Sequence, residues 1–163
     1  MKKHKRKLYI LIGVPGSGKS TWAKAQHNAV VLSSDDIRLE KFGTLDCQEK
    51  NKEVFQLLHN RLEYYTQYSD SNIIYDATNI NQRRRKAIFE KHKSNFEVVA
   101  VVFDLPIDKL LKNNNKREGL AVVPEYVIKR MAKDIQWPTV DVDCNSIIDV
   151  YNGVRTVKLD KEY

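Results

Sequence analysis

Short apolar runs alternate along the chain with longer segments in which apolar residues recur every three or four positions. The runs predict strands, and the periodic segments predict helices. Strands and helices in alternation imply a parallel sheet with helices on both faces. The expected strands are residues 7–12, 30–32, 72–75, 96–103 and 147–151, with a further short strand at 154–159 after an Asn-Gly turn. The expected helices follow the first strand to residue 26 and the second from residue 35, and then span 47–68, 81–93, 107–116 and 124–134.

The longest helical pattern, residues 47–68, places Val54, Leu58 and Leu62 on one face, which predicts packing on the sheet. It ends in a tyrosine group, Tyr64, Tyr65 and Tyr68. Core or helix-edge packing is the simpler interpretation of this group, and a stacking platform for nucleobases is the alternative. The strand at 96–103 is apolar almost throughout, which predicts burial on both faces.

A glycine-rich segment joins the first strand to the first helix. Residues 13–21, GVPGSGKST, fit the P-loop pattern G-x-x-x-x-G-K-[ST]. Its glycines allow positive φ angles, so that successive N–H groups and the following helix N-terminus face a phosphate chain. Lys19 is expected to reach the β- and γ-phosphates, and Ser20 to ligate Mg²⁺. The predicted nucleotide-binding residues are Gly16, Ser17, Gly18, Lys19, Ser20 and Thr21.

Composition and charge narrow the class of protein. The 163 residues are expected to form one domain, 1–163, with a basic tail at residues 1–6. A net charge of +7 favours a polyanionic partner, and a merely basic surface is the alternative. Cys47 and Cys144 are expected to be free thiols in a reducing, cytoplasmic setting. No apolar run is long enough to span a membrane.

Polar side chains follow several of the predicted strands, at the edge of a parallel sheet where ligands bind. Asp35 and Asp36 follow the second strand, so one carboxylate there can orient and deprotonate an alcohol, or both can simply start a helix. Asp76 ends the third strand. It can hold a magnesium-bound water or bond a backbone amide, and the sequence leaves both open.

Arginines occupy two further positions of interest. Arg83, Arg84 and Arg85 open a helix whose N-terminus already carries partial positive charge, which suggests a nearby anion; a solvated basic face is the alternative. Arg117 lies in a glycine-broken connection that suits a lid over the phosphates, at about 112–124, although it can also be a plain surface arginine. The segment 141–145, DVDCN, imitates a phosphatase motif but lacks the preceding apolar strand, and we reject that activity.

A set of motifs extends from about residue 7 to about residue 134. It comprises residues 13–23 (GVPGSGKSTWA), 34–38 (SDDIR), 78–81 (TNIN) with Arg84 and Arg85, 102–106 (VFDLP), Lys116-Arg117 and 121–124 (AVVP). In order and spacing the chain resembles the kinase domain of phage polynucleotide 5′-hydroxyl kinases, within the wider group of small P-loop kinases. The resemblance implies an adenylate-kinase-like, three-layer α/β/α fold with a central parallel sheet and a helical lid.

The resemblance also implies a function and roles for individual residues. ATP would enter one mouth of a tunnel and the 5′ end of DNA or RNA the other. Asp35 would be the general base, Arg38 would hold the acceptor's phosphate, and Arg117 would join Lys19 on the donor's phosphates. Thr78 and Arg84 would line the acceptor side. The implied cofactors are ATP and Mg²⁺.

The chain departs from the phage pattern at two points. Asn113 stands where the family has a further lid arginine, and Ala77 follows Asp76 where the family has an acidic residue directly before Thr-Asn. The Asp-Ala-Thr-Asn version is similar to the broader kinase group, some of whose members act on small molecules. Two other functions therefore remain open: a kinase for a nucleoside, sugar or antibiotic, and a nucleotide-gated binding module without transferase activity.

Overall fold

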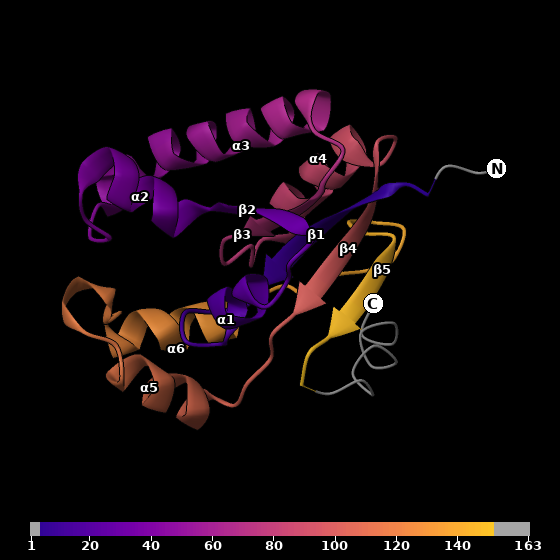
Figure 1. The fold of residues 1–163 in the computed structure, drawn as a ribbon. Helices are drawn as coiled ribbons and strands as arrows, with labels where there is room; N and C mark the ends of the chain where they lie inside the picture. The colour runs from indigo at the N-terminus through magenta and orange to yellow at the C-terminus, as the bar shows by residue number, and fades with distance from the viewer. Residues whose placement is uncertain (1–3, 152–163) are drawn as a thin grey trace.

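The structure, a computed structural model, describes residues 4–151 and is built on one parallel sheet. Its five strands lie in the order β2-β3-β1-β4-β5, and every neighbouring pair is parallel (Figure 1). β1, which leads into the glycine-rich segment, is therefore central. The strands are β1 (Arg6–Ile12), β2 (Ala29–Ser33), β3 (Asn72–Asp76), β4 (Phe96–Val102) and β5 (Ser146–Asp149).

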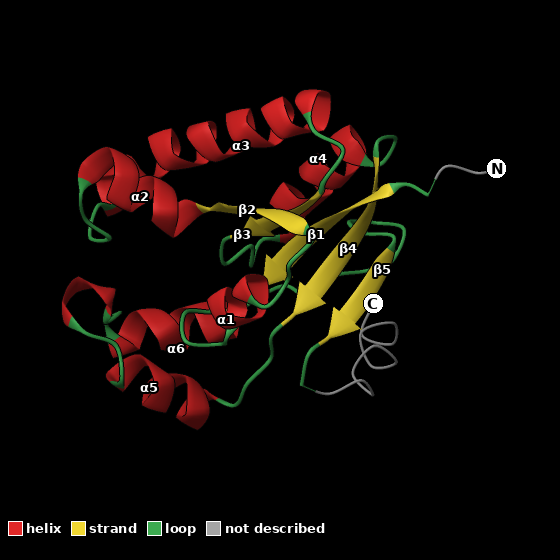
Figure 2. Ribbon diagram, in the orientation of Figure 1, coloured by secondary structure: helices red, strands yellow, loops and turns green. Residues whose placement is uncertain are grey.

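Helices cover both faces of the sheet, which gives the three-layer α/β/α fold that the sequence predicts (Figure 2). In the view of Figure 1, α3 and α4 lie above the sheet, and α1, α5 and α6 lie below it. The helices are α1 (Lys19–Lys24), α2 (Ser34–Phe42), α3 (Asn51–Tyr68), α4 (Gln82–His92), α5 (Ile107–Asn115) and α6 (Glu125–Asp134). Two short 3₁₀ turns are η1 (Gln48–Lys50) and η2 (Gly119–Ala121).

The core follows the predicted hydrophobic pattern. Val54, Leu58 and Leu62 of α3 are fully buried against the sheet, as their spacing predicts. In β4 every residue except Glu97 is buried, which confirms that this strand is covered on both faces. Because β4 and the carboxyl-terminal end of its neighbour β1 are buried, the loops that follow these strands have a fixed base.

Side-chain caps fix where two helices begin at that edge. Ser33 Oγ accepts a hydrogen bond from the N–H of Asp36 at 3.3 Å and starts α2. Asn81 Oδ1 accepts one from the N–H of Arg84 at 3.0 Å and starts α4, as expected. Each cap satisfies a backbone donor that lacks an intrahelical partner, and each directs the first turn of its helix toward the carboxyl edge of the sheet.

Several boundaries differ from the sequence prediction. α1 ends at Lys24 rather than residue 26, because the N–H of Gln26 turns to the carbonyl of Ala23 in a tighter, 3₁₀-type bond. The predicted helix at 47–68 is divided into η1 and α3. β5 stops at Asp149, two residues early, and Tyr151 contacts the glycine-rich segment instead. The strand expected at 154–159 lies outside the described residues.

Candidate active site

The loops that follow β1 and β3 are bonded to each other at the carboxyl edge of the sheet. The N–H of Gly13 donates to the carbonyl of Thr78 at 3.1 Å. The Asn79 amide donates to the carbonyls of Leu11 at 2.7 Å and Ala77 at 3.2 Å. Asn79 has a φ of 50°, a conformation that Asn tolerates better than most residues. The sequence motif includes Thr78 and Asn79, but only the structure shows that the Asn79 amide joins the loop after β3 to the strand β1.

The glycine-rich loop has the backbone that its motif requires. Gly16 and Gly18 have φ angles of 86° and 95°, so a side chain at either position would be strained. Ser17 is fully buried, and its N–H donates to the carbonyl of Val14 at 3.2 Å. The loop is therefore a compact turn that ends at the N-terminus of α1, where backbone donors can surround an anion.

The Lys19 ammonium lies in the middle of the expected site. Its Nζ donates to the carbonyl of Val14 at 3.2 Å. Burial lowers the pKa of Lys19 to about 8; the charges of Asp76 and Asp35 oppose this shift, and that of Arg117 adds to it. Charges from three other segments therefore influence this ammonium. A cation held so far from its ordinary pKa of 10.5 is well suited to a polyanionic ligand.

Asp76 at the end of β3 and Ser20 at the start of α1 form the candidate metal position. Asp76 is 7 % exposed, and burial raises the pKa of its carboxyl, while Lys19 and a hydrogen bond with the Ser20 side chain lower it. A hydroxyl and a carboxylate are hard oxygen ligands that suit Mg²⁺, which keeps several waters and takes others from phosphates. Among residues 4–151 no group of three or more His, Cys, Asp and Glu side chains could hold a metal alone.

Asp35 and Arg38 form an ion pair on the first turns of α2. The distance from Asp35 Oδ1 to Arg38 Nη1 is 3.0 Å, and the two side chains are 60 % and 10 % exposed. Arg38 Nη2 donates to Asn51 Oδ1 at 2.8 Å, so the first residue of α3 supports the arginine from behind. Within the described chain, the buried Nε of Arg38 has no hydrogen-bond acceptor. Asn51 is a contact that sequence analysis missed.

The segment between α5 and α6 is held in a folded conformation by one buried asparagine. Asn114 donates to the carbonyl of Val123 at 2.7 Å and accepts from its N–H at 2.9 Å. Arg117 lies inside this closed turn and donates to the carbonyl of Ala121 at 3.2 Å. Beneath it, Leu110, Ile128 and Val14 of the glycine-rich loop share one small core. The structure therefore joins the expected lid directly to the phosphate-binding loop.

The three arginines of α4 have different environments. Arg85 is buried, pairs through Nε with Asp143 Oδ2 at 2.8 Å, and donates through Nη1 to the carbonyl of Asn79 at 2.6 Å. Arg83 and Arg84 are exposed. For Arg85, the anion that its position suggested is a carboxylate of the protein itself. Asp143 belongs to the phosphatase-like segment, which is thus structural.

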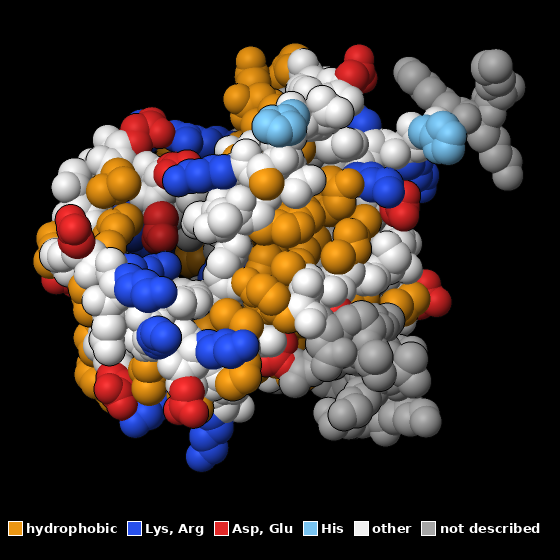
Figure 3. Space-filling view, turned by 60° about the horizontal axis from the view of Figure 1, so that its bottom comes forward, with side chains coloured by type: hydrophobic (Ala, Val, Ile, Leu, Met, Phe, Trp, Pro, Cys, Tyr) orange, Lys and Arg blue, Asp and Glu red, His pale blue; other side chains and the backbone are white. Residues whose placement is uncertain are grey.

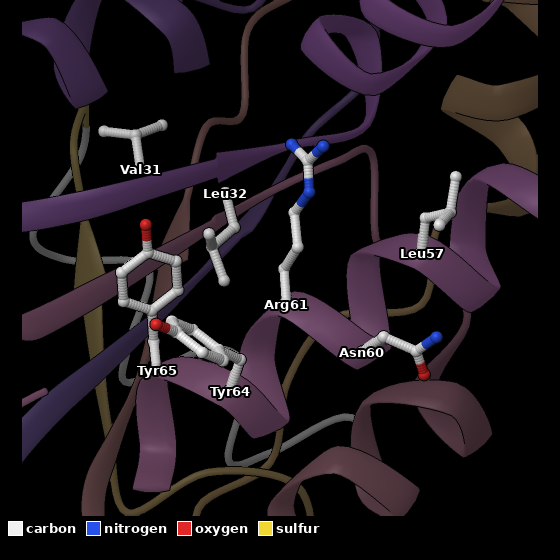
Figure 4. Close-up of a pocket in the computed structure, with 7 residues that line it drawn as sticks. All are labelled: Val31, Leu32, Leu57, Asn60, Arg61, Tyr64 and Tyr65. Carbon is white, nitrogen blue, oxygen red and sulfur yellow. The ribbon is translucent and has the colours of Figure 1, made fainter. Parts of the chain in front are cut away.

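The tyrosine group lies at the edge of α3, next to a groove. The Tyr64 and Tyr68 rings are exposed with centroids 5.0 Å apart, and Tyr65 is half-buried. The groove has a volume of about 380 Å³ and lies between α3 and the edge strand β2 (Figure 4). None of the predicted site residues lines it. Its lining residues are Val31, Leu32, Leu57, Asn60, Arg61, Tyr64 and Tyr65.

Basic side chains gather on one face of the molecule. Figure 3 shows Lys and Arg side chains gathered beside a hollow on the face that carries α5 and α6.

Cys47 and Cys144 are both buried and free, as expected. None of the helices within residues 4–151 is both long enough and apolar enough to cross a membrane.

The parallel sheet, the glycine-rich loop before α1 and the closed turn between α5 and α6 define a P-loop protein of the kinase type. A family model described as an AAA domain matches residues 8–138. The chain therefore belongs to that AAA domain family, whose match covers the glycine-rich loop, α2, the end of β3 and the segment between α5 and α6.

Two curated relatives are similar over most of the chain. The first is a putative bifunctional polynucleotide kinase/RNA ligase of Autographa californica nuclear polyhedrosis virus, 25 % identical over 78 % of this chain and 21 % of that protein. The second is the L-seryl-tRNA(Sec) kinase of Methanococcus maripaludis, 29 % identical over 90 % of this chain and 62 % of that protein. The chain thus spans less than two thirds of either relative.

Solved structures support the same fold. A chain in the structure of the Pnkp1/Rnl/Hen1 RNA repair complex is 28 % identical with a TM-score of 0.70, covering 82 % of this chain and 45 % of that one. The APS kinase of Mycobacterium tuberculosis is 16 % identical with a TM-score of 0.57, covering 98 % of this chain and 94 % of that one. At that identity the second likeness is evidence of fold alone.

Proposed function

We propose that this protein is an ATP- and Mg²⁺-dependent kinase that transfers the γ-phosphoryl group to the 5′-hydroxyl of a polynucleotide. The observation that carries the proposal is the position of Lys19 on the glycine-rich loop, bonded to the Val14 carbonyl, where the charges of Asp76, Arg117 and Asp35 all influence its pKa. Phosphoryl transfer requires alignment and charge neutralisation more than covalent chemistry from the protein. A cation on the phosphate loop, with carboxylates on neighbouring segments that influence its charge, is suited to both.

In this proposal each group has one role, which the resemblance to P-loop kinases suggests. Asp35 accepts the proton of the acceptor hydroxyl, whose oxygen attacks the γ-phosphorus while the bond to the β–γ bridging oxygen breaks and ADP leaves. Lys19 and Arg117 neutralise the charge on the phosphates as that bond breaks. Bound Mg²⁺ would neutralise the β- and γ-phosphate oxygens, with Ser20 and Asp76 on its protein side.

The residues on the acceptor side of the site favour a substrate that itself carries phosphate. Asp35 and Asn51 hold the Arg38 guanidinium, and within the described chain its buried Nε–H group donates to no acceptor. A planar guanidinium fixed in this way suits a phosphate next to the reacting hydroxyl. The relatives named for polynucleotide kinase and tRNA kinase activity, and the net charge of +7, favour a nucleic acid. Exposed Arg84 and the loop that contains Thr78 would line the same acceptor side.

A comparison of acceptors tests the proposal. With labelled ATP and Mg²⁺ we expect phosphate on the 5′ ends of DNA or RNA oligonucleotides, and affinity for them should fall steeply with salt because phosphate contacts release counterions. Labelling of nucleosides, sugars or antibiotics alone would instead assign the chain to small-molecule kinases. Binding of ATP without any transfer would favour a nucleotide-gated binding module.

Replacement of the proposed base gives a second test. Asp35→Asn keeps the size of the side chain but removes its ability to accept a proton, so we expect the phosphoryl-transfer rate to fall about 10²- to 10⁴-fold. ATP affinity should change little. Asp36→Asn, at the next position on the same helix turn, is the matched control and should keep most of the rate. An Asp35→Asn protein that is fully active would remove Asp35 from the mechanism.

A further inference from the structure

Two side chains from outside the glycine-rich loop hold its carbonyl groups from behind. The hydroxyl of Tyr151 donates to the carbonyl of Ser17 at 2.7 Å. The amide of Asn113 on α5 donates to the carbonyl of Gly16 at 2.8 Å. Neither contact is part of the P-loop sequence pattern, and the two residues lie far from the loop in the sequence.

The Tyr151 contact is close and well supported. A β-carbon on Gly18 would meet the Tyr151 hydroxyl, and the φ of 95° at Gly18 also favours glycine there. The Tyr151 ring packs edge-on to Phe103, with centroids 6.4 Å apart, and the N–H of Tyr151 donates to Asp149 Oδ1 at 3.2 Å. The hydroxyl is therefore held in place by its ring and by its backbone.

Peptide geometry gives these contacts a consequence for ligand binding. In a planar trans peptide the C=O and the N–H point in opposite directions. The bond from Tyr151 to the Ser17 carbonyl therefore directs the Gly18 N–H to the far side of the loop, where the motif binds phosphate. In the same way, the bond from Asn113 directs the Ser17 N–H inward, and that N–H donates to the Val14 carbonyl at 3.2 Å.

We infer that Tyr151 and Asn113 are positioning residues that set the backbone of the phosphate-binding loop before the nucleotide arrives. They contact no ligand themselves in this role. A loop whose donors already face the anion loses less conformational freedom when the anion binds, so affinity for the phosphate chain is higher. The inference rests on the proposed nucleotide site, but it does not depend on which acceptor is used.

Tyr151→Phe tests the inference, because it keeps the ring and removes only the donor. Calorimetry should show affinity for ATP and for inorganic tripolyphosphate falling about three- to tenfold, the range of one net hydrogen bond. Affinity for adenosine should be unchanged. In kinase assays the KM for ATP should rise by the same factor while the KM for the acceptor stays constant. Tyr68→Phe, on the exposed end of α3, is the control and should match the unaltered protein.

Asn113→Ala provides a second, independent variant. It should weaken tripolyphosphate binding to a similar extent, and the double variant should lose less than the product of the two single losses, because both contacts order one loop. Equal tripolyphosphate affinity in Tyr151→Phe and the unaltered protein would overturn the inference and leave the proposed function standing. A loss of adenosine affinity of the same size would also overturn it. If the unaltered protein binds neither ATP nor tripolyphosphate, the inference and the proposed function fail together.

Discussion

At the scale of single residues, the candidate site depends on charges that are only partly compensated within the protein. Burial lowers the pKa of Lys19 although Asp76 and Asp35 lie close enough to oppose the shift. Burial also raises the pKa of the Asp76 carboxyl although Lys19 is near. A triphosphate with Mg²⁺ would supply both missing partners, an anion for the lysine and a cation for the carboxylate. The two opposite shifts therefore favour the same ligand.

Nucleotide affinity should depend on pH through Lys19. Because the pKa of Lys19 is about 8 without ligand and bound phosphate favours the charged form, binding raises this pKa. ATP binding should then take up a proton above pH 8, and affinity should fall by up to about tenfold for each further pH unit. Calorimetry at pH 7.5, 8.5 and 9.5, in buffers with different ionisation enthalpies, measures both effects. A constant affinity up to pH 9.5 would contradict this prediction; Lys19→Met, which has no ammonium, should lose most binding at every pH.

The position of Arg38 should depend on Asn51. Asn51→Ala removes one of the two contacts that fix the guanidinium, so the KM for the polynucleotide acceptor should rise about tenfold, as expected for a hydrogen bond to a charged group. The KM for ATP should stay constant. Gln56→Ala, on the exposed face of the same helix, is the control. If the KM for the acceptor and the KM for ATP change together in steady-state assays, Asn51 acts on the fold rather than on Arg38.

At the scale of elements, short polar contacts determine how the loops at the carboxyl edge are arranged. Asn79 joins the loop after β3 to the strand β1, and Asn114 closes the turn between α5 and α6. Caps at Ser33 and Asn81 set the directions of α2 and α4. These side chains replace backbone partners that the irregular segments lack. The site is thus formed by loops that are themselves hydrogen-bonded.

Replacement of Asn114 should open the lid. Asn114→Ala leaves the N–H and the C=O of Val123 without their buried partner, which should lower the free energy of unfolding by about 1–3 kcal/mol. Hydrogen exchange across residues 116–124 should accelerate, and the rate of phosphoryl transfer should fall because Arg117 is no longer fixed. Asn115→Ala, exposed at the next position of α5, should change neither quantity. Normal exchange in this segment of the Asn114 variant would show that other contacts hold the lid.

At the scale of the whole molecule, a buried ion pair connects the two halves of the chain beneath the site. Arg85 and Asp143 are both almost fully buried and 2.8 Å apart, and Asp143 also accepts the N–H of Thr139 at 2.7 Å. Arg85 reaches the Asn79 carbonyl as well. The connection to the edge strand β5 is therefore anchored to the loop that contributes Thr78.

Removal of one member of this pair should be costly. Arg85→Ala leaves the Asp143 carboxylate buried without its main cation, and the free energy of unfolding should fall by about 3–5 kcal/mol in urea titrations. Replacing both residues, as in Arg85→Met with Asp143→Leu, should recover much of this loss because no buried charge remains. Arg83→Ala, an exposed neighbour, should cost less than about 0.5 kcal/mol. A small loss in Arg85→Ala would mean that water reaches Asp143 readily.

The sequence alone determined the fold class and the phosphate-binding loop. Periodic apolar positions specify which residues are buried in a strand or helix, and the P-loop depends on glycines and a lysine that are adjacent in the chain; both are local properties. The resemblance to P-loop kinases added the roles of Asp35, Arg38 and Arg117, which remain proposals. The ends of helices and strands were less predictable, as at α1 and β5, because the last bonds of an element compete with nearby loop contacts.

Only the tertiary structure decided which polar residues are structural and which are available to a ligand. Arg84 and Arg85 are adjacent and chemically identical, yet one is exposed and the other is bonded to a carboxylate 58 positions away. Tyr151 and Asn113 likewise reach the glycine-rich loop from segments that are distant in the sequence. Such pairings arise from the way strands and helices pack in three dimensions, and no local pattern in one sequence specifies them.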